Sequence, residues 1–327
     1  MDIRVLQGDA LEISADVLVL KYAQALYGVD ELVVHRLEAT GPAVRDTLPK
    51  PDGFRLIDTG GHLAAKSVLF VGVVALRVFG YAAIREFSKR ALTSLAGAKP
   101  AASHIAFTLH GAGYGLDESE AFRAEVAGIL DAVETGDCPS GIKLVTIIER
   151  NAGRARRLQT LLDAILPRPA AKPAIAAAQI ERLRSAGAAS RTKPHIFVAM
   201  LFAPEFDDHF HYGIQQAVNA AGYLCERADL TTFTGDVIAW VKERINSARL
   251  LVADLSTANP NVYLEVGYAW GRGIPTVLLA RDAADLRFDV KGQRCLVYNS
   301  IRKLEESLTS ELKALRGLLS GLTARWT

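Results

Sequence analysis

Two acidic residues with an amide between them, at positions 254 to 265, have types and a spacing that could serve chemistry. Asp254 ends the apolar run 250–254, which has the pattern of a buried strand. Open α/β sheets bind ligands beyond the carboxyl ends of such strands. A loop with Pro260 follows, and Asn261 can cap a helix predicted to start at residue 262. Glu265 would then lie in the first turn of this helix.

Glu265 also has a purely structural interpretation. An acid four positions after an asparagine matches a helix-capping arrangement, and the positive end of a helix stabilises a carboxylate there by ~0.3–1 kcal/mol. The helix does not need Glu265 for packing, because Val262, Val266 and Ala269 already supply its apolar stripe. On the residues alone, both the catalytic and the structural interpretation stay open.

A glycine-rich segment that follows the apolar run 105–109 is a second candidate. Its members are Gly111, Gly113, Tyr114 and Gly115. Glycines between a strand and a helix leave backbone amides free to approach a phosphate group. The alternative is a tight strand-to-helix turn, which the acids Asp117 and Glu118 favour because they would repel an anion.

His209 and His211 stand in an acidic stretch after the run 196–200, and acids beside imidazoles suggest a metal site. A spacing of two residues points the rings to different sides of a helix, however. We therefore predict a solvated helix start and no metal site here. The three cysteines lie far apart and form no CxxC pair, so neither a zinc site nor a disulfide framework is indicated.

Alternating strand and helix patterns would position these candidates in both halves of the chain. Strands are predicted at 3–7, 16–20, 67–73, 105–109, 144–148, 196–200, 224–227, 250–254, 276–279 and 295–298. Helices are predicted at 81–96, 118–135, 153–165, 206–221, 235–247, 262–272 and 301–318. Apolar runs rich in β-branched residues suit strands buried on both faces, so each half should hold a largely parallel or mixed sheet covered by helices.

A stretch rich in proline, alanine and arginine separates the two halves. A chain of 327 residues exceeds the usual size of a single core, so two domains are expected. Residues 167–193 have the composition of a solvated linker with a short helix in its middle. We therefore predict domains at 1–166 and 194–327.

The composition is that of a globular protein, with 50% hydrophobic and 23% charged residues and no apolar run long enough for a bilayer. The formal net charge is +2 and the basic residues are scattered, so nucleic acid is not an expected partner. Small anionic ligands remain open. The first residues lack the pattern of a signal peptide, so a cytoplasmic protein is expected.

Five segments of the C-terminal half, 195–202, 223–229, 233–237, 251–256 and 259–269, carry a family resemblance. They resemble the nucleoside 2-deoxyribosyltransferase-like group, which is related in fold to Toll/interleukin-1 receptor (TIR) domains that cleave NAD. The resemblance implies a flavodoxin-like domain with a parallel five-stranded sheet. It also implies that Glu265 is catalytic, because the glutamate of the E-x-G-x-A-type helix is the catalytic residue in those families.

The chemistry implied by this resemblance takes place at the anomeric carbon of an N-glycoside, which becomes oxocarbenium-like as the base departs. A nearby carboxylate can form a covalent intermediate or stabilise the charge before water or another acceptor attacks. Glu265 would have this role, and Asp254 and Asn261 would hold ribose or phosphate groups. An apolar wall for the base would be formed by Met200, Phe202 and Phe233. The families usually have proline where Leu201 stands.

Three segments of the N-terminal half, 6–20, 58–69 and 110–115, resemble a macro domain, the fold that binds ADP-ribose and related nucleotides. The resemblance implies a mixed sheet, an adenine contact for Asp9 and a ligand-binding role for the glycine-rich segment. Macro domains that hydrolyse ADP-ribosyl bonds carry an asparagine pair after the second strand, and residues 21–30 of this chain contain no asparagine. The N-terminal half is therefore interpreted as a nucleotide sensor or a degenerate scaffold.

These observations predict an α/β protein with two three-layer α/β/α domains. The leading hypothesis is N-glycosidic cleavage of NAD or a related nucleotide, controlled by an ADP-ribose-type ligand on the N-terminal domain, as in bacterial antiviral defence modules. NAD would be a substrate, so no cofactor is expected. The alternatives are a nucleoside 2-deoxyribosyltransferase or nucleoside monophosphate N-glycosidase, and a non-catalytic nucleotide-binding signalling protein. The resemblance also implies a homo-oligomer, because related proteins complete their pockets across subunits.

Overall fold

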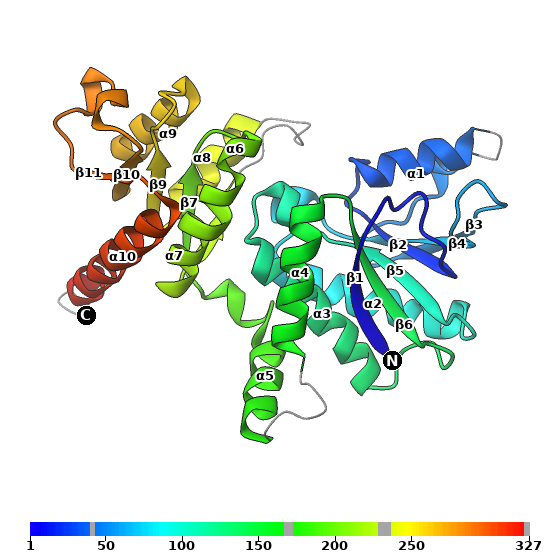
Figure 1. The fold of residues 1–327 in the computed structure, drawn as a ribbon. Coiled ribbons are helices and arrows are strands. Elements are labelled where there is room, and N and C mark those ends of the chain that lie inside the picture. Colours follow the sequence, from blue (N-terminus) through cyan, green and yellow to red (C-terminus); the bar gives the residue numbers. More distant parts are fainter. Residues whose placement is uncertain (40–42, 167–172, 228–236, 324–327) are drawn as a thin grey trace. The chain divides into compact units, whose positions relative to one another are not determined.

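A computed structural model describes residues 1–39, 43–166, 173–227 and 237–323 (Figure 1). The chain forms two compact units. The first consists of Met1–Ala112 and Glu118–Arg191, and the second of Gly113–Asp117 and Thr192–Thr327. Each unit is built around one β-sheet.

The first unit holds a mixed six-stranded sheet. Its strands are β1 (Asp2–Gln7), β2 (Val17–Tyr22), β3 (Phe54–Asp58), β4 (Ser67–Gly72), β5 (His104–Thr108) and β6 (Leu144–Glu149). They lie in the order β1-β6-β5-β2-β4-β3, in which β3 pairs antiparallel with β4 and the other pairs are parallel. Strands β2 and β4 are apolar and buried along nearly their whole length, because helices cover both of their faces.

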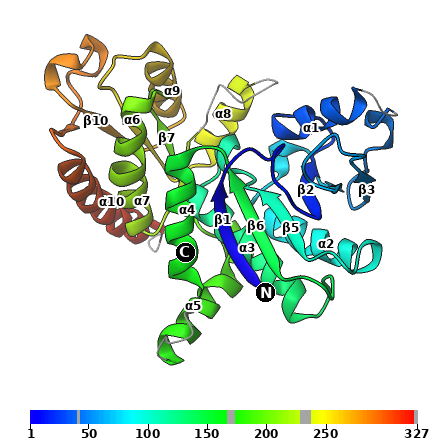
Figure 2. The ribbon, with the colours of Figure 1, turned by 45° about the vertical axis from the view of Figure 1, so that its right-hand side comes forward.

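The helices of the first unit are α1 (Val29–Glu38), α2 (Tyr81–Ala98), α3 (Glu118–Glu134), α4 (Ala152–Ile165) and α5 (Pro173–Ser185). Core residues of β2 and β4 pack against α1 on one face of the sheet. On the other face, α2 and α3 lie side by side (Figures 1 and 2). The unit therefore has three layers, with the sheet in the middle.

The second unit holds a five-stranded sheet. Its strands are β7 (His195–Ala199), β8 (Leu224–Glu226), β9 (Leu250–Asp254), β10 (Thr276–Ala280) and β11 (Cys295–Val297). They lie in the order β11-β10-β9-β7-β8, and all four pairings are parallel. Short apolar runs that are buried on both faces explain why the sequence forms these strands.

Helices again cover both faces of this sheet. They are α6 (Pro204–Asp208), the π-helical segment η5 (His209–Ile214), α7 (Gln215–Ala220), α8 (Val237–Ser247), α9 (Pro260–Gly271) and α10 (Ile301–Thr323). One apolar core joins the sheet to α6, η5, α7 and α10. A second core, on the opposite face, joins it to α8 and α9.

The strand order places a topological switch point between β7 and β9. From β7 the chain continues to β8 at one edge of the sheet, whereas from β9 it continues to β10 and β11 at the other edge. Open α/β sheets bind ligands beyond the carboxyl ends of the strands at such a point. The switch-point edge is the name used here for Asp254, which ends β9, together with residues 200–203 and 255–259, which follow β7 and β9.

The structure confirms the predicted fold class, with one mixed and one parallel sheet in three-layer units. Helix α1 and the edge strand β3 were not predicted. Residues 167–193 were predicted to be a solvated linker, but helix α5 within this stretch belongs to the first unit. Leu183 is buried there, and Arg85 donates hydrogen bonds to the carbonyl oxygens of Arg184 and Ala186 at 2.6 and 2.7 Å. Packing and these bonds fix a segment whose composition indicated solvation.

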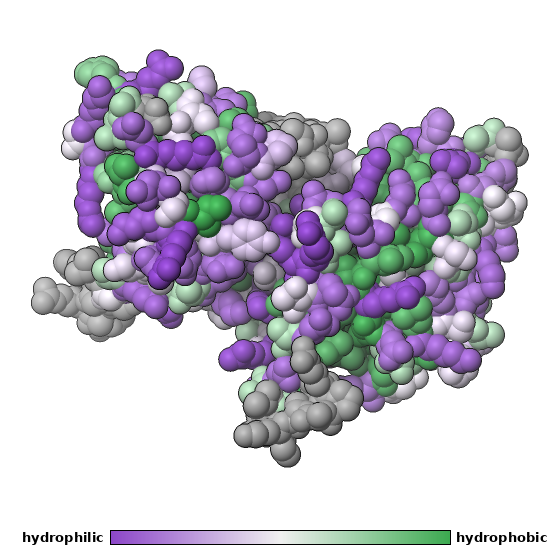
Figure 3. All heavy atoms as spheres, in the orientation of Figure 1, coloured by the Kyte–Doolittle hydropathy of each residue, from purple (hydrophilic) through white to green (hydrophobic). Residues whose placement is uncertain are grey.

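Hydrophilic side chains cover most of the face shown in Figure 3, and the apolar groups that reach this face gather over the strands of the first unit. Large exposed apolar side chains also occur on α8 and α9: Ile238, Leu264 and Trp270. Among the helices of the described residues, none combines the length and the apolar composition needed to cross a bilayer.

Candidate functional site

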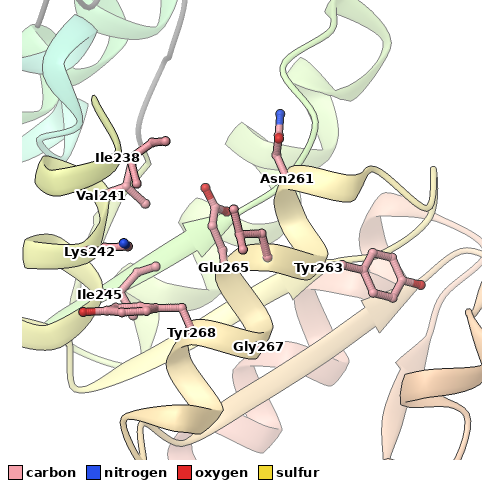
Figure 4. Close-up of a pocket in the computed structure, with 10 residues that line it drawn as sticks. Ile238, Val241, Lys242, Ile245, Asn261, Tyr263, Glu265, Gly267 and Tyr268 are labelled. Carbon is pink, nitrogen blue, oxygen red and sulfur yellow. The ribbon is translucent and has the colours of Figure 1, made fainter. Parts of the chain in front are cut away.

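A cavity of about 450 Å³ lies between α8 and α9 of the second unit (Figure 4). Helix α8 contributes Ile238, Val241, Lys242 and Ile245 to its lining. Helix α9 contributes Asn261, Tyr263, Leu264, Glu265, Gly267 and Tyr268. Two of the residues predicted for the site, Glu265 and Asn261, are therefore brought together at one cavity. They are four positions apart on α9 and so lie on the same side of the helix.

The local structure of α9 removes the capping interpretation of Glu265. The helix begins at Pro260, and its N-cap is Asn259, whose side chain accepts a hydrogen bond from the backbone N–H of Asn261 at 2.9 Å. The prediction that Asn261 caps the helix was wrong. Proline suits the first helical position, so the helix begins at Pro260, two residues before the predicted start. Glu265 is thus the sixth helical residue. It lies beyond the first turn, and the helix dipole stabilises carboxylates mainly within that first turn.

The Glu265 carboxylate is in an electrostatically unusual place. Burial raises its pKa from 4.5 to about 7, since the surrounding side chains are largely apolar and disfavour its charged form. Among the described residues, none forms a hydrogen bond or an ion pair with this carboxylate. Figure 4 shows the side chain reaching from α9 toward α8. A half-buried carboxylate without a partner is an arrangement that active sites use and that stability alone does not favour.

Polar groups are few in the rest of the cavity lining. The ammonium group of Lys242 lies 5.6 Å from the centroid of the Tyr268 ring. The hydroxyl group of Tyr268 accepts a hydrogen bond of 2.8 Å from Asn246. The ring thus has a fixed position in a cavity that offers one acid, one cation and an aromatic surface.

The other predicted substrate residues lie elsewhere in the second unit. Asp254 is buried at the carboxyl end of β9, where it accepts hydrogen bonds from the backbone and hydroxyl of Ser256 and from the hydroxyl of Tyr298 at 2.6 Å. Met200 and Phe202 follow β7, and Met200 belongs to the core on the face opposite α9. The structure therefore gathers these three residues at the switch-point edge and not at the cavity of Glu265. Phe233 lies outside the described residues.

Two arginines that the sequence interpretation missed accompany this edge. The guanidinium group of Arg227, after β8, lies 4.1 Å from the ring centroid of Phe202 and 3.7 Å from that of Phe210. The guanidinium group of Arg281, after β10, lies 4.3 Å from the ring centroid of Phe206. Arg227 is the last residue of the predicted strand 224–227, and Arg281 lies two residues after the predicted strand 276–279; these positions were the signal available in the sequence.

One of the two histidines of this region differs from its prediction. His211 is buried, and its Nδ1 atom lies 3.0 Å from Oε1 of Gln215, so it is not part of a solvated helix start. His209 is partly exposed and lies beside Arg281. The segment η5 packs into a core of the second unit through Phe210 and Ile214, and this tertiary contact, which the residue spacing does not show, buries His211. Within the described ranges, no group of three or more His, Cys, Asp or Glu side chains could hold a metal ion.

The candidates of the N-terminal half are distributed over both units. Asp9 accepts a hydrogen bond from the backbone N–H of Leu11 at 2.9 Å. Gly111 adopts a φ of +90° after β5, a conformation that favours glycine. Residues 113–117, which include Gly113, Tyr114 and Gly115, belong to the second unit. The predicted phosphate loop is therefore divided between the units.

Gly115 shows why its position requires glycine. Its φ is +89°, and a Cβ atom there would collide with the indole ring of Trp240. Its carbonyl oxygen accepts a hydrogen bond from the backbone N–H of Arg227 at 3.2 Å. Close packing inside the second unit accounts for this glycine without a ligand.

A buried group of ionisable side chains lies in the first unit. Lys21 and Asp30 form an ion pair of 2.9 Å, and both side chains are almost fully buried. Burial raises the pKa of the nearby Glu125 to about 8, although a hydrogen bond from the backbone of His110 and the charge of Lys21 oppose this shift. Burial likewise holds the pKa of His110 well below 6.5. A neutral glutamic acid and a neutral histidine thus accompany one ion pair at pH 7.

Several solved structures that are similar to this chain are macrodomains. The Trypanosoma brucei macrodomain in complex with ADP is 20% identical, with a TM-score of 0.39, and the match covers 49% of this chain, in its N-terminal half, and 68% of that chain. For the Oceanobacillus iheyensis macrodomain with ADP the identity is 16%, the TM-score 0.40, and the coverage 49% and 90%. No family model and no curated protein matches the sequence.

Proposed function

We propose that the second unit cleaves the N-glycosidic bond of NAD or a related nucleotide, with Glu265 as the catalytic residue. One observation carries this proposal: a largely apolar cavity holds the Glu265 carboxylate, whose pKa burial raises to about 7. This carboxylate has lost hydration without gaining a partner among the described residues. It is therefore prepared for a substrate that brings positive charge.

Cleavage of NAD develops that charge at the anomeric carbon. The bond between this carbon and the nicotinamide nitrogen breaks, and its electron pair leaves with nicotinamide, which departs as a neutral molecule. The ionised carboxylate of Glu265 attacks the anomeric carbon or stabilises the oxocarbenium ion. Water then adds to the carbon and one proton is released to solvent.

The raised pKa fits a cationic substrate better than a neutral one. A carboxyl group with a pKa near 7 is ionised in roughly half of the molecules at neutral pH. A pyridinium ring bound close to Glu265 would lower this pKa, and attraction between the two charges is strong in apolar surroundings. A neutral nucleoside lacks this assistance, and this difference places NAD ahead of deoxynucleosides.

The first unit is proposed to bind an ADP-ribose-type ligand that controls the second. The resemblance of its segments to macro domains supports ligand binding. The Lys21–Asp30 ion pair occupies the segment that carries asparagines in ADP-ribosyl hydrolases, which supports binding without hydrolysis. A ligand-controlled, NAD-depleting homo-oligomer in the cytoplasm would suit antiviral defence.

The test is release of free base from NAD, nucleoside monophosphates and deoxynucleosides, followed by chromatography with and without added ADP-ribose. Glu265→Gln keeps the shape of the side chain and removes its charge. Glu243→Gln is the matched control, because Glu243 is an exposed acid of α8 that does not line the cavity. We expect nicotinamide release by the unmodified chain and by Glu243→Gln, and none by Glu265→Gln.

Other outcomes would change the assignment. Release of base from deoxynucleosides, with transfer to an added base, would show a deoxyribosyltransferase. Release from monophosphates but not from NAD would show a nucleotide N-glycosidase. No release from any substrate, with ADP-ribose present, would make the protein a nucleotide-binding module.

A further inference from the structure

The cavity between α8 and α9 carries two opposite charges that do not neutralise each other. Glu265 of α9 and Lys242 of α8 both line it, one from each helix (Figure 4). They form no ion pair with each other, and neither has an ion-pair partner elsewhere among the described residues. Burial, without a contribution from Lys242, raises the pKa of Glu265 to about 7. The acid and the cation are therefore two distinct charged positions in one cavity.

An aromatic ring lies beside the cation. The ammonium group of Lys242 is 5.6 Å from the ring centroid of Tyr268. Two hydrogen bonds in series fix this ring: Nε of Arg272 donates to Oδ1 of Asn246 at 3.0 Å, and Nδ2 of Asn246 donates to the Tyr268 hydroxyl at 2.8 Å. The first bond orients the amide so that its nitrogen faces the hydroxyl. Tyr268 thus offers a planar surface in a fixed position, next to a cation on a flexible side chain.

The acid and the ring follow one another along α9. Glu265 and Tyr268 are three residues apart, so their side chains lie about one turn apart on the same side of the helix. Figure 4 shows both on the side of α9 that faces Lys242 and Ile245 of α8. Apolar side chains from both helices form most of the remaining lining. A ligand that lies along this side of α9 therefore meets first an acid and then a planar surface with a cation.

The base of a nucleotide in this cavity would have contacts other than those that the family resemblance implies. Met200 and Phe202, which were expected to form an apolar wall for the base, do not line the cavity. Tyr268 and the apolar side chains of α8 do line it. A planar base that leaves from an anomeric carbon next to Glu265 can therefore lie against the ring of Tyr268. Lys242 is then the charged group that is available to a substituent of this base.

We propose that the cavity binds a pyridine nucleotide whose base carries a carboxylate, with the base against Tyr268 and the carboxylate at Lys242. This assignment rests on the proposed function, because it places the anomeric carbon beside Glu265. A pyridine-3-carboxylate joined to ribose carries a positive ring nitrogen and a negative carboxylate. The positive end would face Glu265 and the negative end Lys242, so each charge of the cavity would meet its opposite.

The charge of the base separates this substrate from NAD. The carboxamide of NAD is neutral, so its base has a net positive charge that Lys242 repels, whereas the carboxylate accepts a charge-assisted hydrogen bond from Lys242. The bond changes are the same for both. The electron pair of the glycosidic bond leaves with the base, which departs as a pyridine carboxylate anion, and water adds to the anomeric carbon with release of one proton. Lys242 is thus a residue that determines specificity.

Base release from NAD and from nicotinic acid adenine dinucleotide, with and without ADP-ribose, tests the assignment, because these substrates differ only in carboxamide and carboxylate. We expect the full chain to cleave the acid form with a kcat/KM roughly tenfold or more above that for NAD, as a charge-assisted hydrogen bond predicts. Lys242→Gln should bring the ratio of the two values to about one. Lys303→Gln, at an exposed lysine of α10 that does not line the cavity, is the control and should keep the ratio.

The role of Tyr268 has its own pair of variants. Tyr268→Phe keeps the planar surface, whereas Tyr268→Leu removes it. We expect KM for both dinucleotides to rise several-fold more in Tyr268→Leu than in Tyr268→Phe, because loss of stacking weakens the binding of either base. An equal KM in the two variants would overturn the contact between Tyr268 and the base.

Hydrogen exchange on the full Glu265→Gln chain separates this inference from the proposed reaction, because it reports binding without turnover. We expect the acid form to slow exchange in residues 237–247 and 260–271 at a lower concentration than NAD does. Equal or faster cleavage of NAD by the unmodified chain, or a preference for the acid form that persists in Lys242→Gln, would overturn the assignment and leave the proposed reaction in place. No base release, with preferential protection by the acid form, would support the site and overturn the reaction. Neither release nor protection would overturn both.

Discussion

Glu265 in the second unit and Glu125 in the first are both carboxylates that burial has moved toward the neutral form, to pKa values of about 7 and about 8. Their surroundings differ in access. Glu265 lines a cavity of about 450 Å³, whereas Glu125 is fully buried. A raised pKa alone therefore does not identify a catalytic acid, and the open space next to the carboxylate is the feature that separates the two.

The strongest test of this comparison is to neutralise each glutamate in turn. Glu265→Gln should lower the rate of base release by roughly a thousandfold or more, because the group that meets the anomeric charge is lost. Glu125→Gln should leave the rate within about twofold, since no substrate reaches that position. Initial rates of nicotinamide release measure both. A large loss in Glu125→Gln with unchanged folding would contradict the distinction by access.

The buried ion pair of the first unit offers the next largest effect. Lys21→Met leaves Asp30 without its cation in a fully buried place, and removal of one partner of such a pair costs about 3–5 kcal/mol. Arg302→Met removes one partner of an exposed pair with Glu306 and should leave the free energy of unfolding nearly unchanged, because water screens the two charges. Urea unfolding of both variants measures the difference. Equal losses would show that burial does not decide the value of these pairs.

The pKa of Glu125 predicts how the first unit responds to pH. The folded state holds this proton up to about pH 8, whereas the unfolded chain releases it near 4.5. The folded state therefore binds more protons between these values, and the free energy of unfolding falls as pH rises through this window, by several kcal/mol in total. In Glu125→Gln this part of the slope should vanish. Denaturant unfolding between pH 5 and 8 gives the comparison, and parallel curves would refute it.

The pKa of Glu265 predicts a smaller effect, on activity. If the ionised carboxylate reacts, kcat/KM should be constant above about pH 7 and fall by up to tenfold for each unit below it. Activity therefore rises with pH, whereas the stability contribution of Glu125 falls with pH, because the charged form of Glu265 is the reactive one. A rate profile from pH 5 to 9 measures it. Activity that rises on the acidic side would assign Glu265 as a proton donor.

Much of the fold could be predicted from residue patterns. Buried strands such as β9 and long helices such as α2 carry strong periodicity, so their positions were predicted within a few residues. Strand β3 was missed because it is an edge strand, largely exposed, with little apolar pattern. Helix α1 was missed because its segment follows a glycine and is rich in acidic residues, a composition that does not predict a helix packed against the core.

The candidate site was predicted only in part, for reasons of geometry. Glu265 and Asn261 share a cavity because residues four apart lie on one side of a helix, which sequence spacing can reveal. Asp254 lies at a different place, since its side chain points to the face of the sheet opposite α9, and spacing along a loop does not fix such a direction. The partners of Arg227 and Arg281 come from distant segments, so only the folded chain brings them together.

One feature of the fold bears on how this protein can be divided. Residues 113–117 belong to the second unit although residues of the first precede and follow them. Asp117 accepts a hydrogen bond of 2.9 Å from the backbone of Cys225, and Gly115 accepts one from Arg227, beside the edge strand β8. A fragment that starts at residue 192 would lack both acceptors and expose an unprotected strand edge, which favours aggregation. In expression and domain-exchange experiments the two units are thus not interchangeable cassettes.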